Sequence, residues 1–197
     1  MRTRTLLIGV LSVFVLGLAI PSTVNAQVVG IKVGLNVANV SFEAKGFQVN
    51  PEARKGLVAG LFVDFASSRK VGLQLEGLIS MKGAVLPFGP NDVETFRVSY
   101  LEIPVLARFN LSNSSKAHPV LLVGPALGIR LKVTSETIKS NDISRGDVGF
   151  SVGGGVEAGR GVLEVRYTRG LRNIVADGSA TLKNRAIAVM VGVRSSK

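Results

Sequence analysis

Charged side chains of both signs recur within otherwise apolar segments of this 197-residue chain. The carboxylates Glu76, Glu102 and Glu164 could serve as general acids or bases if cations lay beside them. In a water-poor interior, however, charges must be paired with one another. We favour this second interpretation, an ion-paired network with a structural role. Its predicted members are Lys32, Glu76, Glu102, Arg108, Arg130, Glu157, Glu164 and Arg166.

Other forms of chemistry find little support. The chain has no cysteine and a single histidine, His118, so neither a thiolate site nor a zinc or copper site is expected. His118 stands beside Pro119 in a segment predicted as a turn, where a solvated histidine is more common than a catalytic one. The glycines Gly153–Gly155 match a dinucleotide-binding pattern, but a second alternating segment follows where that motif needs a helix. We therefore predict no catalytic residue, no cofactor and no metal.

The elements that must position the charged residues are β-strands. In Leu57–Phe65 and Leu101–Phe109 every second side chain is apolar. Successive side chains of a strand point to opposite faces, so each such segment has one apolar face. Eight strands are predicted on this basis: Val29–Ala38, Gly56–Phe65, Val71–Lys82, Thr95–Phe109, Val120–Lys132, Asp147–Ala158, Val162–Gly170 and Lys183–Arg194. Most reach the roughly 9–11 residues that a tilted strand needs to cross a bilayer.

The predicted connections differ in length. The short or intermediate ones are Ala66–Lys70, Asn110–Pro119 and Gly159–Gly161, and the long polar ones are Asn39–Lys55, Gly83–Glu94, Val133–Gly146 and Leu171–Leu182. Outer-membrane barrels have short periplasmic turns and longer external loops. With an even number of strands, both termini would lie on the short-turn side.

The class of protein depends on which face of the sheet points outward. A soluble ligand-carrying barrel would turn its apolar face inward, whereas a membrane barrel turns it outward. The polar face combines charges with many glycines, which suits a narrow lumen filled by side chains. The apolar face is almost uniformly aliphatic, whereas ligand cavities carry a few placed polar groups. Its residues include Ile31, Val33, Leu35 and Val37 in one strand and Ile187, Val189, Val191 and Val193 in another. We therefore predict an all-β fold, an eight-stranded antiparallel up-and-down transmembrane β-barrel.

The first 26 residues have the features of a secretory leader. Arg2 and Arg4 precede the apolar run Leu6–Ile20, and Val24-Asn25-Ala26 offers a small-residue cleavage site. The run has 15 residues, fewer than the roughly 20 of a membrane-spanning helix. We expect a cleavable signal peptide at residues 1–26 and a barrel domain at residues 27–197.

The chain is basic, with a formal net charge of +11. Such a charge would permit contact with nucleic acid or anionic lipid. No arginine-rich helix and no basic stretch with interleaved aromatic residues supports nucleic-acid binding. We assign the basic residues to turns and a polar lumen, and predict no nucleic-acid partner.

Several segments also resemble a known family. Gly30–Asn36 is similar to the opening strand of PorT-like outer-membrane β-barrel proteins, and Tyr100–Leu106 contains their recurrent YLEIP strand. Gly124–Gly128 and Glu164–Leu171 look like later strands of that family. The resemblance covers most of residues 27–197 in the expected order. It implies an eight-stranded barrel in the outer membrane of a Gram-negative cell envelope.

The expected function is that of a non-enzymatic outer-membrane barrel with a structural or interaction role, or of a narrow porin-like barrel. Its surroundings would be outer-membrane lipid, with envelope or secretion proteins as further partners. The founding PorT type is associated with protein secretion across the outer membrane, so the resemblance also implies an accessory role in secretion as an alternative. A soluble ligand-binding barrel and a barrel enzyme stay open, and the enzyme would need an outward-facing catalytic cluster that we do not find.

Overall fold

A computed structural model describes residues 27–44, 47–49, 52–66, 70–87, 93–112, 117–134, 146–171 and 181–195. The predicted leader, residues 1–26, lies outside these ranges. The described residues form nine strands: β1 (Gln27–Ala44), β2 (Phe47–Val49), β3 (Glu52–Ala66), β4 (Val71–Pro87), β5 (Val93–Asn110), β6 (Ala117–Thr134), β7 (Gly146–Ala158), β8 (Gly161–Gly170) and β9 (Thr181–Arg194).

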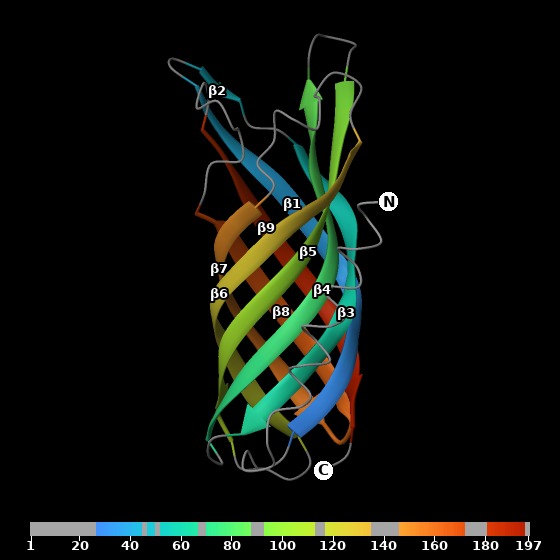
Figure 1. The fold of residues 1–197 in the computed structure, drawn as a ribbon, viewed down its shortest axis with the longest axis vertical. Coiled ribbons are helices and arrows are strands. Elements are labelled where there is room, and N and C mark those ends of the chain that lie inside the picture. Colours follow the sequence, from blue (N-terminus) through green and yellow to red (C-terminus); the bar gives the residue numbers. More distant parts are fainter. Residues whose placement is uncertain are drawn as a thin grey trace.

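The eight long strands form one closed sheet. Each pairs antiparallel with the next in the order β1-β3-β4-β5-β6-β7-β8-β9, and β9 pairs with β1 to close the cylinder. Figure 1 shows the barrel, with its strands tilted steeply against the long axis. Closure gives each of these strands a hydrogen-bonded neighbour on both sides, which a sheet in hydrocarbon requires. The predicted eight-stranded antiparallel up-and-down barrel is confirmed.

Several strands extend beyond their predicted ends. β1 continues to Ala44 and β4 to Pro87, both within segments predicted as long loops. The short strand β2 pairs with residues 42–44 of β1, so the predicted loop Asn39–Lys55 was wrong over most of its length. Pairing between β1 and β9 satisfies the backbone there although the apolar residues shift from odd-numbered to even-numbered positions (Val40, Phe42 and Ala44). The predicted pattern of apolar residues therefore marks only part of the strand, and backbone pairing continues beyond it.

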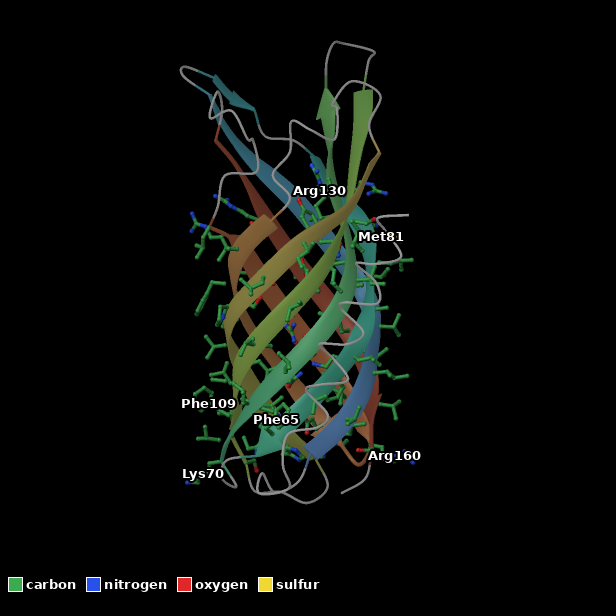
Figure 2. The ribbon with its side chains drawn as sticks, viewed as in Figure 1. Phe65, Lys70, Met81, Phe109, Arg130 and Arg160 are labelled. Atoms are coloured by element: carbon green, nitrogen blue, oxygen red, sulfur yellow. The ribbon has the colours of Figure 1, made fainter. Side chains whose placement is uncertain are left out.

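Side-chain burial follows the predicted alternation. On β1, Lys32 and Asn36 point inward and are buried, whereas Ile31 and Leu35 point outward and are each 58% exposed. The outer surface is a band of aliphatic side chains that project away from the cylinder (Figure 2). Phe65 and Phe109 lie toward the short-turn end of this band and Met81 toward the other end. The outward orientation of the apolar face is therefore as predicted.

Glycines permit the tight geometry of the narrow barrel. A Cβ atom at Gly60 would lie 2.0 Å from the carbonyl oxygen of Gly77 on the neighbouring strand. The inward glycines thus do more than leave space for long side chains, because here the neighbouring backbone itself occupies that space. Gly159, with φ of 56°, forms the β7–β8 turn in the left-handed region that glycine adopts without a steric penalty.

Val165 tests the outward face, because it is 49% exposed in the middle of β8. Val165→Arg should lower the free energy of unfolding by about 2–4 kcal/mol in phosphatidylcholine vesicles, since hydrocarbon cannot solvate a guanidinium. The measurement is equilibrium unfolding of the reconstituted protein. The control, Val165→Leu, keeps the surface apolar and should change little. Equal stability of Val165→Arg and the parent would show that this face does not meet hydrocarbon.

Candidate functional site: the charged interior of the barrel

The centre of the lumen holds four buried charged residues from three strands. Glu76 of β4 forms a bidentate ion pair with Arg166 of β8, in which Nη1 donates to Oε2 at 2.5 Å and Nη2 to Oε1 at 2.7 Å. Lys32 of β1 joins the two carboxylates, with its Nζ 2.9 Å from Glu76 Oε1 and 2.5 Å from Glu164 Oε2. Glu164 also pairs with Arg166. Two cations and two carboxylates therefore form a balanced group, here called the central cluster.

The Glu76–Arg166 pair crosses the whole barrel. In the closed order of eight strands, β4 and β8 are four strands apart in either direction, so they stand on opposite walls. The side chain of Gln74 donates to Glu76 Oε1 at 2.5 Å, and the Lys32 ammonium lies 4.5 Å from the centroid of the Phe62 ring. Every charge of the central cluster thus has an opposite charge beside it, as a low-dielectric interior requires. These carboxylates act as acceptors for fixed cations, which does not suit an acid–base role.

A second cluster surrounds Glu157 at the short-turn end of β7. Its Oε2 accepts from Arg108 Nη2 at 2.7 Å and from Arg194, and it lies 3.0 Å from His118 Nε2. Asp64 of β3 lies 3.9 Å from Arg108 Nε. We call this group the lower cluster.

The position of His118 corrects the sequence interpretation. His118 is not in a turn, because β6 already begins at Ala117. Pairing of β6 with β7 places His118 directly opposite Glu157. The ring therefore contacts a buried carboxylate and is not a freely solvated side chain.

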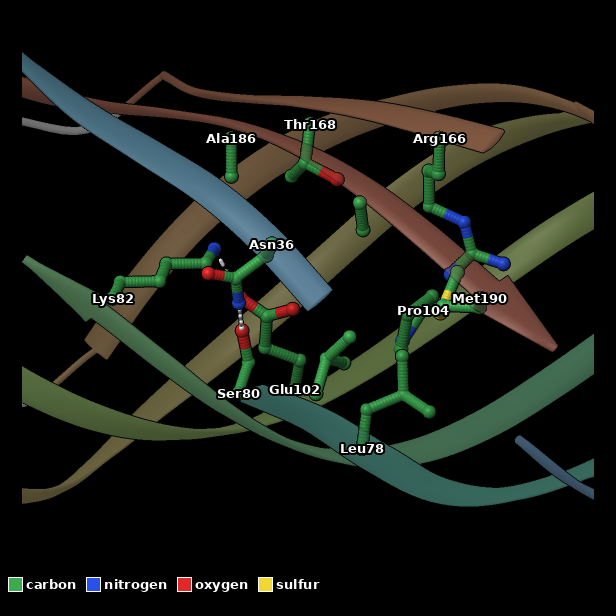
Figure 3. A pocket seen from close by; sticks show the side chains of 12 residues that line it. Asn36, Leu78, Ser80, Lys82, Glu102, Pro104, Arg166, Thr168, Ala186 and Met190 are labelled. Atoms are coloured by element: carbon green, nitrogen blue, oxygen red, sulfur yellow. Dashed lines mark hydrogen bonds and ion pairs between the residues drawn. The ribbon is translucent and has the colours of Figure 1, made fainter. Parts of the chain in front are cut away.

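The third group, the upper cluster, lies toward the long-loop end. Lys82 of β4 forms an ion pair with Glu102 of β5, and its Nζ is 5.7 Å from the centroid of the Tyr100 ring. Asn36 donates to Ser80 at 2.9 Å. A cavity of about 20 Å³ lies between these groups and Arg166 (Figure 3), which is room for about one water molecule. Side chains thus fill the lumen at this level.

Seven of the eight residues predicted for the network belong to the three clusters. Lys32, Glu76, Glu164 and Arg166 meet in the central cluster, Arg108 and Glu157 in the lower one, and Glu102 in the upper one. Arg130 is half-buried on β6, opposite Tyr100 in register and toward the long-loop end (Figure 2).

Sequence reasoning missed several partners. Asp64, Lys82 and Arg194 complete the ion pairs of the upper and lower clusters. Each stands on the same alternate positions as the predicted members. The alternation of inward and outward positions could therefore have found all three, but the predicted network did not include them.

Within the described ranges, no helix is long and apolar enough to cross a membrane. Among the same residues, no group of three or more histidine, aspartate or glutamate side chains is arranged to hold a metal ion.

Removing one partner from the central cluster should be more harmful than removing two. Arg166→Met should cost about 3–5 kcal/mol of stability, because Glu76 and Glu164 would share the single cation Lys32. The double variant Arg166→Met/Glu76→Gln restores the balance of charge and should recover most of that loss. Thermal unfolding in neutral detergent is the measurement.

A matched control is Arg160→Met, the same chemical change at an exposed position of the β7–β8 turn. It should leave the unfolding midpoint nearly unchanged. If Arg166→Met is as stable as this control, or if the double variant is worse than the single one, the central cluster does not stabilise the barrel by charge pairing.

Comparison with known proteins extends the structural result. The family model of the outer membrane protein beta-barrel domain matches residues 25–176. Among solved structures, the outer membrane protein OprG from Pseudomonas aeruginosa is 12% identical, with a TM-score of 0.55, over 87% of this chain and 97% of that one. Neisserial surface protein A is 14% identical, with a TM-score of 0.52, over 84% of this chain and 96% of that one.

At these identities the two solved structures support the fold alone. No curated protein matches the chain. The family model covers more than half of the sequence, and an outer-membrane family implies that the aliphatic band is surrounded by outer-membrane lipid. The chain belongs to the outer membrane protein beta-barrel domain family.

Proposed function

We propose that this chain is a non-enzymatic integral barrel of the outer membrane whose lumen is closed and whose role is structural or lies in interactions with other envelope components. One observation carries the proposal, namely the Glu76–Arg166 ion pair that joins opposite walls of the barrel. A solute moving along the axis would have to separate this pair and leave buried charges without partners. That step costs several kcal/mol, which opposes a porin-like role.

The surroundings of the clusters support the same proposal. Glu76 is 0% exposed and Arg166 is 3% exposed, so neither side chain faces an open aqueous channel. Eight-stranded barrels are just wide enough for side chains to fill the interior. The functional surfaces of such a protein are its loops, its two rims and its lipid-facing wall. A non-enzymatic role fits because the described carboxylates of the central cluster are engaged in ion pairs.

We also propose the finer assignments that the sequence suggests. The YLEIP segment lies in β5, where Tyr100 and Pro104 point into the lumen and contribute to its packing. This supports membership of the PorT-like type within the family. Residues 1–26 would act as a signal peptide that exports the barrel domain, residues 27–197, to the outer membrane.

The resemblance favours one second candidate, an accessory role in protein secretion. Such a protein would be recovered with other envelope proteins when it is purified in mild detergent. The closed lumen is compatible with this role, because a helper need not conduct its cargo.

Conductance across a planar bilayer tests the closed lumen. The folded protein should produce no stepwise ionic current, because the central cluster blocks the axis. Folding is checked independently by the mobility of unboiled against boiled protein on a gel, where a closed barrel should shift. A reconstituted open porin is the control for the bilayer. Discrete, reproducible current steps from gel-shifted protein would replace the proposal with a narrow pore.

A further inference from the structure

Among the side chains that the structure describes, the outward charges of the strands have one sign. Acidic side chains whose placement the structure describes all lie on inward positions: Asp64, Glu76, Glu102, Asp147, Glu157 and Glu164. Within the strands, the described outward charges are all basic. They are Lys55 on β3, Arg169 on β8 and Arg185 on β9, and all three are exposed. These residues, here called the outer basic patch, are not part of any cluster in the lumen.

Two of these residues face each other directly. Arg169 of β8 and Arg185 of β9 are register partners. Like charges directly opposite one another destabilise a sheet. Lys55 adds to the patch from β3. Its register partner on β1 is Val37, and the partner of Val37 on β9 is Ile187, two residues from Arg185. The patch thus extends over four neighbouring strands and lacks an anion among the described side chains.

The patch lies at the edge of the aliphatic band. Arg169 comes eight residues after Gly161, the first residue of β8. At about 3.3 Å per residue and a tilt of about 35–45°, this height is roughly 20 Å above the short turn, and the apolar band of such barrels is about 25 Å tall. Arg169 therefore stands near the level of the headgroups on the long-loop side.

Aromatic residues mark the same level. Phe150 of β7 is the register partner of Arg169 and is 46% exposed. Tyr167, two residues before Arg169, is 37% exposed on the same face. Aromatic side chains gather where hydrocarbon meets headgroups. Their presence beside the arginine pair places the outer basic patch at that interface.

We propose that the outer basic patch binds the phosphate of a lipid headgroup in the outer leaflet. The arginine pair would share one phosphate, whose oxygens accept from both guanidinium groups and cancel their repulsion. Lys55 adds a third positive charge nearby. The inference rests on the proposed function, since it requires the barrel to span the outer membrane with its long-loop end outside.

Titration with a phosphomonoester lipid tests this site. The folded protein in neutral detergent micelles is titrated with phosphatidic acid, and the midpoint of thermal unfolding is followed by the gel shift. The midpoint should rise with phosphatidic acid and not with phosphatidylcholine. In Arg169→Gln/Arg185→Gln, half-saturation should need about 30-fold more phosphatidic acid, from the contribution of about 1 kcal/mol per basic residue near an anionic surface.

Two control variants separate a site from general electrostatics. Arg169→Lys/Arg185→Lys keeps both charges and should bind within about threefold of the parent. Lys70→Gln/Arg160→Gln removes two charges at the opposite rim (Figure 2) and should not change half-saturation. Equal weakening by the two Gln double variants would overturn the site. If the Arg169/Arg185 variant does not fold, the single variants Arg169→Gln and Arg185→Gln are tested in its place.

The remaining arms identify the source of the phosphate. Inorganic phosphate should not raise the midpoint, and an equal rise with inorganic phosphate would overturn a lipid ligand. A parent that shifts on the gel but gains nothing from phosphatidic acid contradicts this inference alone. A parent that does not shift contradicts the proposed barrel itself.

Discussion

The ion pair between Glu76 and Arg166 links opposite walls of the barrel, and it requires the charged faces of β4 and β8 to point inward. Both residues can reach the axis only if their face of the strand points inward. The alternation of side chains then forces the intervening residues, such as Leu75 and Val165, to point outward. Glu164, two residues before Arg166, shares its face of β8, and Lys32 of β1 lies beside both carboxylates. Function is then expected at the rims, the loops and the lipid-facing wall.

Most of the fold could be predicted from the sequence, because side chains that alternate between an apolar outer face and a polar lumen give a period-two pattern. The eight long strands, their order and their inward face agree with the prediction. The strand ends could not be predicted in the same way. Beyond Ala38 the apolar residues of β1 shift to the other alternate positions (Val40, Phe42 and Ala44). Beyond Lys82 the apolar residues of β4 are consecutive (Ala84, Val85 and Leu86), so neither extension continues the predicted pattern. The short strand β2 is missed because its three residues are too few to show an alternation.

The sequence predicted most members of the charged network but not which of them form ion pairs with one another. Parity identified Lys32, Glu76 and Arg166 as inward, yet their contacts depend on which strands face each other and on the register across four neighbours. Neither quantity is encoded locally. The prediction that His118 lies in a turn was wrong, because β6 begins earlier than its apolar pattern does. This places the imidazole ring beside Glu157. Lys82 and Arg194, the last residues of their predicted strands, were not included in the predicted network.

The central claim is that the aliphatic face of each strand meets lipid while the charged face meets the lumen. Contacts between acyl-chain protons and side-chain methyl groups, measured by NMR on the unmodified protein in lipid nanodiscs, test it on one strand. On β9 the methyl groups of Ile187, Val189 and Val191 should contact acyl chains, whereas those of Ala186 and Met190 should not. Acyl-chain contacts at Met190, or none at Val189, would contradict the account.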